Sequence, residues 1–190
     1  LESVGVTYFN PDRCTKQLLE SGTGLTADDA NAEAWAIGRR SLEQALATES
    51  NYAFETTLGG RSITDLLIEG ARNGARVRMW FCGLDTPERH LQRIAARVAA
   101  GGHDIPEDKV RDRYEASRLN LIRLLPWLAR LDLHDNSIDR IPSAREIPEP
   151  RRLIRMVDRR IVSIIPLKQM PDWAKPIAMA AIRVDRGEAP

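Results

Sequence analysis

Short runs of β-branched and aromatic residues alternate along this chain with segments whose apolar residues recur at helical spacing. The runs that predict strands cover residues 4–9, 52–57, 77–84 and 131–136. Helices are predicted between them, from Thr26 to about Thr48, from a Ser62–Asp65 capping box to Gly74, from Pro87 to Gly101 and from Pro106 onward. The alternation is typical of βαβ units, so the sequence predicts an α/β fold with a parallel sheet flanked by helices.

The pattern weakens after Asn136. Three prolines between Ile141 and Pro150 predict a surface connection, and residues 151–159 and 161–165 predict a short helix and a short strand. An amphipathic helix is expected from Pro171 onward. Because no linker or repeat divides the chain, we expect residues 1–190 to form a single domain.

The charges nearly balance, with 28 Lys and Arg against 27 Asp and Glu and a net charge of +1. This balance gives no general reason to bind nucleic acid. Only four of the cations are lysines, which leaves 24 arginines. Base composition of the gene explains such a bias, and so does a phosphate site, because arginine binds phosphate in a bidentate fashion.

Cysteine content and hydropathy indicate the cellular compartment in which the protein is expected. Cys14 and Cys82 are far apart and form no Cys-x-x-Cys pair, so neither a metal site nor a disulfide framework is expected. No apolar stretch approaches the ~20 residues that span a bilayer, so no membrane partner is expected. We therefore expect a cytoplasmic protein.

Polar residues follow four of the predicted strands, where doubly wound sheets bind their ligands. They are Asn10-Pro11-Asp12, Glu55-Thr56-Thr57, Asp85 and Asp135-Asn136-Ser137. Such residues are also ordinary helix caps and turn formers, and for any single strand end this alternative stays open.

Glu55 is the most informative of these residues. A carboxylate here could accept hydrogen bonds from a polyhydroxyl substrate, with Thr57 supporting it and Arg61 reaching a phosphate. Asp12 is a candidate general base, because a loop carboxylate at a strand end can accept the proton of a substrate hydroxyl.

A second concentration of arginines lies between residues 89 and 123. Two helices flank a glycine hinge at Gly101-Gly102, which predicts a lid over a phosphoryl group, here residues 97–118. The alternative is two solvated helix faces with ion pairs four residues apart, such as Arg111 with Glu115. The arginines are Arg89, Arg93, Arg97, Arg111, Arg113, Arg118 and Arg123.

The ordered motifs of the chain resemble the zeta-toxin family of P-loop kinases from about Val4 to Ser137. A tail at Met170–Pro176 is similar to the end of bacterial members. The motifs that carry the resemblance are Asn10-Pro11-Asp12, Phe54-Glu55-Thr56-Thr57-Leu58-Gly59-Gly60-Arg61, Phe81-Cys82-Gly83-Leu84-Asp85-Thr86-Pro87-Glu88, Arg97-Val98-Ala99-Ala100-Gly101-Gly102-His103-Asp104-Ile105-Pro106 and Asp135-Asn136-Ser137.

The resemblance implies ATP- and Mg²⁺-dependent phosphorylation of a small-molecule hydroxyl, with a UDP-N-acetylsugar such as UDP-N-acetylglucosamine as the expected substrate and an antitoxin protein as a possible partner. It implies that Asp12 is the base, that Glu55 and Thr57, with Arg61, bind the substrate, and that Asn136 lies near the adenine. Its lid arginines correspond to Arg97, Arg111 and Arg113, with Arg118 in reserve.

The family's P-loop, G-x-x-x-x-G-K-[ST], does not occur in these residues, and Ser21-Gly22-Thr23-Gly24 has no lysine. The resemblance implies that a first, central strand and the P-loop, about 25 residues, precede Leu1 and lie between the strands that end near Thr57 and Leu84. The chain alone is then expected to be inactive as a kinase. A non-catalytic sugar-nucleotide-binding protein, an antitoxin-interacting protein and a housekeeping small-molecule kinase are the alternatives.

Overall fold

The computed structural model describes residues 6–22, 24–102, 104–138 and 149–190. The chain separates into two compact units, the first ending at Thr57 and the second beginning at Leu58. Each unit is described by itself. Whether residues 1–190 act as a single domain stays a prediction.

The first unit contains two short parallel strands and two helices. Strand β1 (Thr7–Phe9) pairs with β2 (Tyr52–Phe54), and helix α1 (Pro11–Glu20) packs against α2 (Ala27–Ala47). The predicted α2 boundaries are confirmed, because Thr26 caps its first turn and Thr48 ends it. The aromatic ring of Phe9 lies so close to Gly38 that a β-carbon there would be 2.5 Å from the ring. Helix α2 therefore approaches β1 closely only because residue 38 is glycine.

The residues after β1 differ from the prediction. Asp12 was expected in a loop, but it lies in the first turn of α1. The side chain of Asn10 caps this helix, and Pro11 occupies the first turn, where its missing N–H costs nothing. The strand end therefore leads directly into a helix N-terminus.

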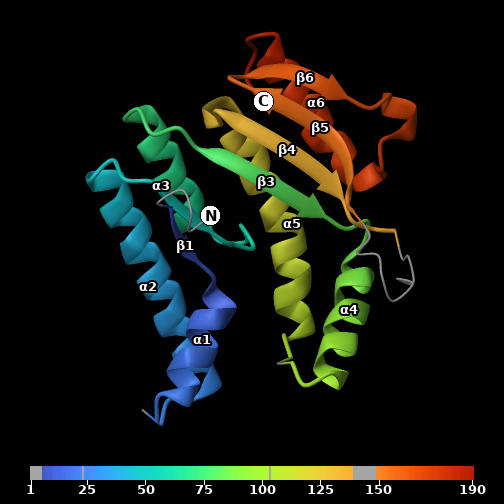
Figure 1. Ribbon diagram of the computed structural model, residues 1–190. Coiled ribbons are helices and arrows are strands. Elements are labelled where there is room, and N and C mark those ends of the chain that lie inside the picture. The colour runs from blue at the N-terminus through green and yellow to red at the C-terminus, as the bar shows by residue number, and fades with distance from the viewer. Residues whose placement is uncertain (1–5, 23, 103, 139–148) are drawn as a thin grey trace. The chain divides into compact units, whose positions relative to one another are not determined.

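The second unit is built around a four-stranded sheet in the order β3-β4-β5-β6, which Figure 1 shows with α5 and α6 on one side. Strands β3 and β4 are parallel, and the β5–β6 hairpin continues the sheet in antiparallel fashion. Short 3₁₀ turns lie at Leu125–Trp127, Leu167–Gln169 and Asp172–Ala174. The elements are α3 (Arg61–Arg72), β3 (Arg78–Gly83), α4 (Pro87–Ala99), α5 (Glu107–Leu124), β4 (Arg130–Asp135), β5 (Arg151–Val157), β6 (Arg160–Ile164) and α6 (Lys175–Asp185).

Three sequence predictions need correction here. Residues 151–157 form β5 and not a helix, because Asp158 and Arg159 adopt positive φ and close a tight hairpin that pairs β5 with β6. The sheet is consequently mixed and not wholly parallel. Helix α3 begins after Gly60 without a side-chain cap, so the predicted Ser62–Asp65 capping box does not form.

The core of the second unit lies between one face of this sheet and helices α5 and α6. Leu131 and Leu133 of β4 and Ile154 of β5 are fully buried, as are Leu121 of α5 and Ile177 of α6. The predicted connection at 141–150 lies almost entirely outside the described residues. Within those residues, no helix is both long and apolar enough to cross a membrane. The class of the fold is α/β.

Candidate functional site

The carboxyl ends of β1 and β2 lie side by side in the first unit, because the strands are parallel and in register. The backbone N–H of Glu55 donates to the carbonyl of Phe9 at 3.1 Å, which extends the pairing by one residue. The phenol of Tyr8 donates a short hydrogen bond to Oε1 of Glu55. The side-chain amide of Asn10 donates to Oε2 at 2.9 Å. Two neutral donors therefore hold the two carboxylate oxygens.

Asn10 has two tasks in this arrangement. Its Oδ1 accepts the backbone N–H of Arg13 at 2.9 Å and so caps α1, while its Nδ2 holds Glu55. The hydrogen bond to Glu55 raises the pKa of the Tyr8 phenol above its ordinary value. Tyr8 therefore stays protonated and donates over the whole physiological range.

Tyr8 was not among the predicted site residues. It reads from the sequence as one of several strand-forming residues, and only the pairing of β1 with β2 brings its hydroxyl to Glu55. Its exposure of 39%, high for a large strand residue, marks it as part of a surface site.

Asp12 and Thr57 complete the predicted residues of the first unit. Both side chains are exposed, and neither has a hydrogen-bond or ion-pair partner among the residues that the structure describes. Asp12 lies in the first turn of α1, where the helix dipole stabilises negative charge. Its role as a proton acceptor stays a prediction.

The glycine loop before α3 belongs to the second unit and is held by a residue that sequence reasoning missed. The buried amide of Asn120 on α5 donates to the carbonyls of Leu58 at 2.8 Å and Gly60 at 3.3 Å. A β-carbon on Gly59 would lie 2.7 Å from Cγ of Arg113, so the stem of that arginine packs on the loop. An asparagine in an otherwise apolar stretch of α5 is the signal that could have identified it. Arg61 begins α3 with its side chain exposed, and its task at a phosphate stays a prediction.

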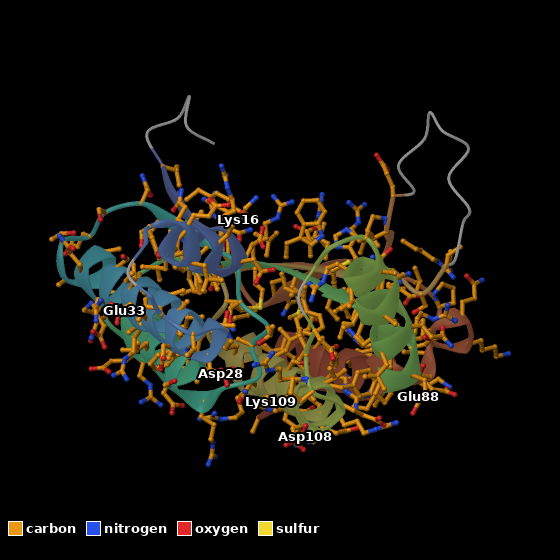
Figure 2. All side chains as sticks on the ribbon, turned by 90° about the horizontal axis from the view of Figure 1, so that it is seen from below. Lys16, Asp28, Glu33, Glu88, Asp108 and Lys109 are labelled. Atoms are coloured by element: carbon orange, nitrogen blue, oxygen red, sulfur yellow. The ribbon has the colours of Figure 1, made fainter. Side chains whose placement is uncertain are left out.

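The predicted lid arginines have local partners. Arg111 pairs with Glu88 on α4 at 2.7 Å and with Glu107 on its own helix at 2.7 Å, and not with Glu115. Figure 2 shows Glu88 on α4 and the start of α5 at Asp108. The Glu88 bond raises the pKa of Arg111, and Arg111 lowers the pKa of Glu88. Both pairs are exposed to solvent, which screens and weakens such interactions.

Two further arginines of the predicted lid region also make local contacts. The stem of Arg97 packs against Gly102, where a β-carbon would lie 2.7 Å from its Cγ. The reserve residue Arg118 lies over the ring of Tyr114, 4.0 Å from its centre, and pairs with Glu115. Arg97, Arg111 and Arg113 thus make separate local contacts, and their convergence on one phosphoryl group stays a prediction.

The ends of β3 and β4 are tied to α4. Arg89 donates to both carboxylate oxygens of Asp85, at 2.6 and 3.1 Å, and this bond lowers the pKa of Asp85. Arg93 donates to the backbone carbonyl of Asn136 at 2.7 Å, and the backbone N–H of Asn136 donates to Gly83 at 2.9 Å. Asn136 is therefore positioned by its backbone, which leaves its side chain for the predicted nucleotide contact.

We searched the part of the chain that the structure describes for a cluster of side chains that could bind a metal ion. No three or more His, Cys, Asp or Glu side chains there are grouped so that they could hold an ion. ATP and Mg²⁺ stay predictions of the resemblance.

Comparisons with known proteins give the chain one clear relative. An uncharacterized protein of Haemophilus influenzae is 32% identical over 106 residues, which are 56% of this chain and 73% of that protein. The chain belongs to the same family as this protein. No model of a known protein family matches the chain, and no solved structure matches it.

Proposed function

We propose that this protein is a kinase of the zeta-toxin type that transfers a phosphoryl group from ATP to a hydroxyl of a UDP-N-acetylsugar. The observation that carries the proposal is the Glu55 carboxylate, oriented by Tyr8 and Asn10 at the joined ends of β1 and β2. Asp12 lies in the first turn of the adjacent helix, and its carboxylate has no partner among the described residues. Two carboxylates with different surroundings suit one binding task and one proton-transfer task.

The tasks follow from the partners of each group. Glu55 already accepts one hydrogen bond on each oxygen, and each oxygen has a second lone pair for a ligand hydroxyl or amide. Asp12 has no partner among the described residues, so it accepts the proton of the hydroxyl that attacks the phosphoryl group. When bound, ATP with Mg²⁺ would supply the phosphoryl group and neutralise its charge.

The P-loop kinase fold is the finer part of the proposal. In that fold a central strand separates the strands that correspond to β2 and β3. In the described residues β2 pairs with β1 in the first unit, and β3 pairs with β4 in the second.

The proposal is tested by ATP turnover of the full-length protein in the presence and absence of UDP-N-acetylglucosamine. We expect turnover that depends on the sugar nucleotide and falls by about 10²–10⁴ in Asp12→Asn, because a general base contributes on that order. Asp28→Asn, an acidic residue in the first turn of the neighbouring helix α2, is the matched control. Equal turnover with and without the sugar nucleotide, or an unchanged rate in Asp12→Asn, would contradict it.

A binding protein without catalysis is the second candidate. It is favoured by the ion pairs of Arg111 with Glu88 and Glu107, which occupy the guanidinium that the kinase would direct at phosphate. This candidate predicts that UDP-N-acetylglucosamine binds to the full-length protein but that no phosphorylated sugar nucleotide forms when ATP is added.

A further inference from the structure

The four-stranded sheet of the second unit has one apolar face and one polar, aromatic face. Leu131, Leu133 and Ile154 point to the apolar face and are completely buried. The alternate residues of β3 and β4 share the opposite face, which we call the open face. Register places six of them in three pairs: Arg78 with Arg130, Trp80 with Asp132 and Cys82 with His134.

The open face exposes a large aromatic ring at the parallel strand pair. Trp80 is 73% exposed, the most of any large hydrophobic residue that the structure describes. Parallel strands are normally covered on both faces, usually by helices. Helices α5 and α6 both lie on the apolar side (Figure 1). Among the described helices of the second unit, α5 and α6 thus leave the ring of Trp80 on the open face exposed.

The charge of this face is positive. Asp132 lies between Arg130 and Arg155, at 2.6 and 2.7 Å, so two guanidinium groups share one carboxylate. Arg78 and Arg152 are exposed on the same face, since Arg152 pairs in register with His134. Neither Arg78 nor Arg152 has a carboxylate partner among the described residues. Four arginines therefore surround a single acidic side chain.

A buried polar group lies under the exposed ring. His134 is 8% exposed, its ring is 5.0 Å from that of Trp80, and its Nδ1 has no hydrogen-bond partner among the described residues. Native proteins leave few buried polar atoms unpaired. The imidazole of His134 is therefore enclosed beside the exposed Trp80 ring, with one nitrogen left unpaired within the described residues.

We propose that the open face binds an acidic amphipathic helix of a partner protein. The apolar stripe of such a helix covers Trp80, as helices cover parallel strands elsewhere. Its carboxylates pair with Arg78 and Arg152, the two arginines that lack a partner. The proposal rests on the second unit alone and is independent of the kinase activity proposed for the protein.

Nucleic acid and a second copy of the chain are less well matched to this face. A nucleic-acid backbone would meet the carboxylate of Asp132 at the centre of the face. A second copy would place arginine against arginine across a symmetric contact, which is repulsive. Both are kept as outcomes of the test.

The test is a titration of the full chain with a synthetic helical peptide of about four turns. The peptide carries leucine on one face and glutamate on the other, and its matched control carries lysine in place of every glutamate. Calorimetry measures affinity, and the indole N–H signals of the four tryptophans report the location. We expect the acidic peptide to bind and the Trp80 signal, assigned with Trp80→Phe, to shift.

Charge-reversal variants distinguish specific binding at the open face from a weak electrostatic attraction of the peptide to the whole protein. We expect Arg78→Glu and Arg152→Glu each to weaken binding about tenfold, whereas Arg186→Glu beyond the end of α6 leaves it unchanged. Circular dichroism verifies that each variant is folded. Equal binding of both peptides, no shift of the Trp80 signal, or no effect of the reversals would overturn the proposal. Tighter binding of single-stranded DNA, or a dimer that buries Trp80, would also overturn it.

Discussion

The carboxylates at the strand ends of the two units have different kinds of hydrogen-bond partner. In the first unit Glu55 accepts hydrogen bonds from a phenol and an amide, and no cation pairs with it among the described residues. In the second unit Asp85 pairs with Arg89 through both oxygens. Neutral donors orient a carboxylate without cancelling its charge, whereas a guanidinium cancels it. Glu55 thus keeps its charge at the surface, where we propose that the ligand binds, and Asp85 holds α4 through Arg89.

The largest expected difference between Glu55 and Asp85 is in the effect of their substitution on ligand affinity. We expect Glu55→Gln to weaken binding of UDP-N-acetylglucosamine about tenfold or more, because an amide replaces a charged acceptor. Asp85→Asn should leave the affinity within about twofold, because Arg89 already uses that carboxylate. Calorimetric titration of both variants measures this. Equal losses in the two variants would remove the distinction between the two strand ends.

Packing at the end of β3 gives the next largest effect. A β-carbon on Gly83 would lie 2.5 and 2.8 Å from ring atoms of the buried Trp173, whose indole N–H donates to Asp135 at 3.2 Å. We expect Gly83→Ala to lower the free energy of unfolding by about 1–3 kcal/mol through overpacking. Gly60→Ala, where the nearest atom is 4.0 Å away, is the control for helix and loop effects. Urea denaturation compares the two, and a stable Gly83→Ala protein would show that the Trp173 ring is free to move.

Asn120 tests whether the glycine loop is held as tightly as the structure indicates. Its amide donates to two loop carbonyls, and Asn120→Ala leaves the buried carbonyl of Leu58 without that donor. We expect a loss of about 1–2 kcal/mol in the free energy of unfolding. Hydrogen exchange of the amides at the start of α3 should quicken in the variant. Unchanged exchange there would mean that the loop is held by other contacts.

The smallest expected effect is a pH dependence of stability from the open face. Burial lowers the pKa of His134 below its ordinary value of 6.5, so the native protein keeps this imidazole neutral while the unfolded chain protonates it. Its contribution to stability is present above pH 6.5 and is lost as the pH falls. His134→Gln should therefore reduce the loss of stability between pH 7.5 and pH 5.5. The pKa of His90 is also lowered by burial, so His90 still makes stability fall with pH in the His134→Gln variant. The dependence of stability on pH is therefore reduced but not abolished.

The sequence predicted most elements but few of their contacts. The α/β class, α2 with its Thr26 cap, β3 and β4 all follow from local patterns, because periodicity and capping are local properties. The prediction of a helix at residues 151–157 was wrong because their side chains also fit a helix. Only the hairpin turn at Asp158 and Arg159 makes this segment a strand. Turn conformation and pairing decide such ambiguous segments.

The candidate site shows the same division. Glu55 and Asp12 are candidates from the sequence because polar residues at strand ends stand out, and Asn10 belongs to the same motif as Asp12. Tyr8 was missed because its role depends on a strand partner more than forty residues away. The ion pair of Arg111 with Glu88 depends on how α4 meets α5, which no local pattern encodes. Long-range contacts are the part that sequence reasoning alone does not reach.

The most direct test of the account is to follow the side-chain amide of Asn10 by NMR while UDP-N-acetylglucosamine is added to the full-length protein. Asn10→Asp assigns the signal, and Asn120 in the second unit supplies a reference amide. The account predicts a saturable shift of the Asn10 amide that is lost in Glu55→Gln, with little change at Asn120. Binding that leaves the Asn10 amide unmoved would contradict the assignment of the ligand site to Glu55.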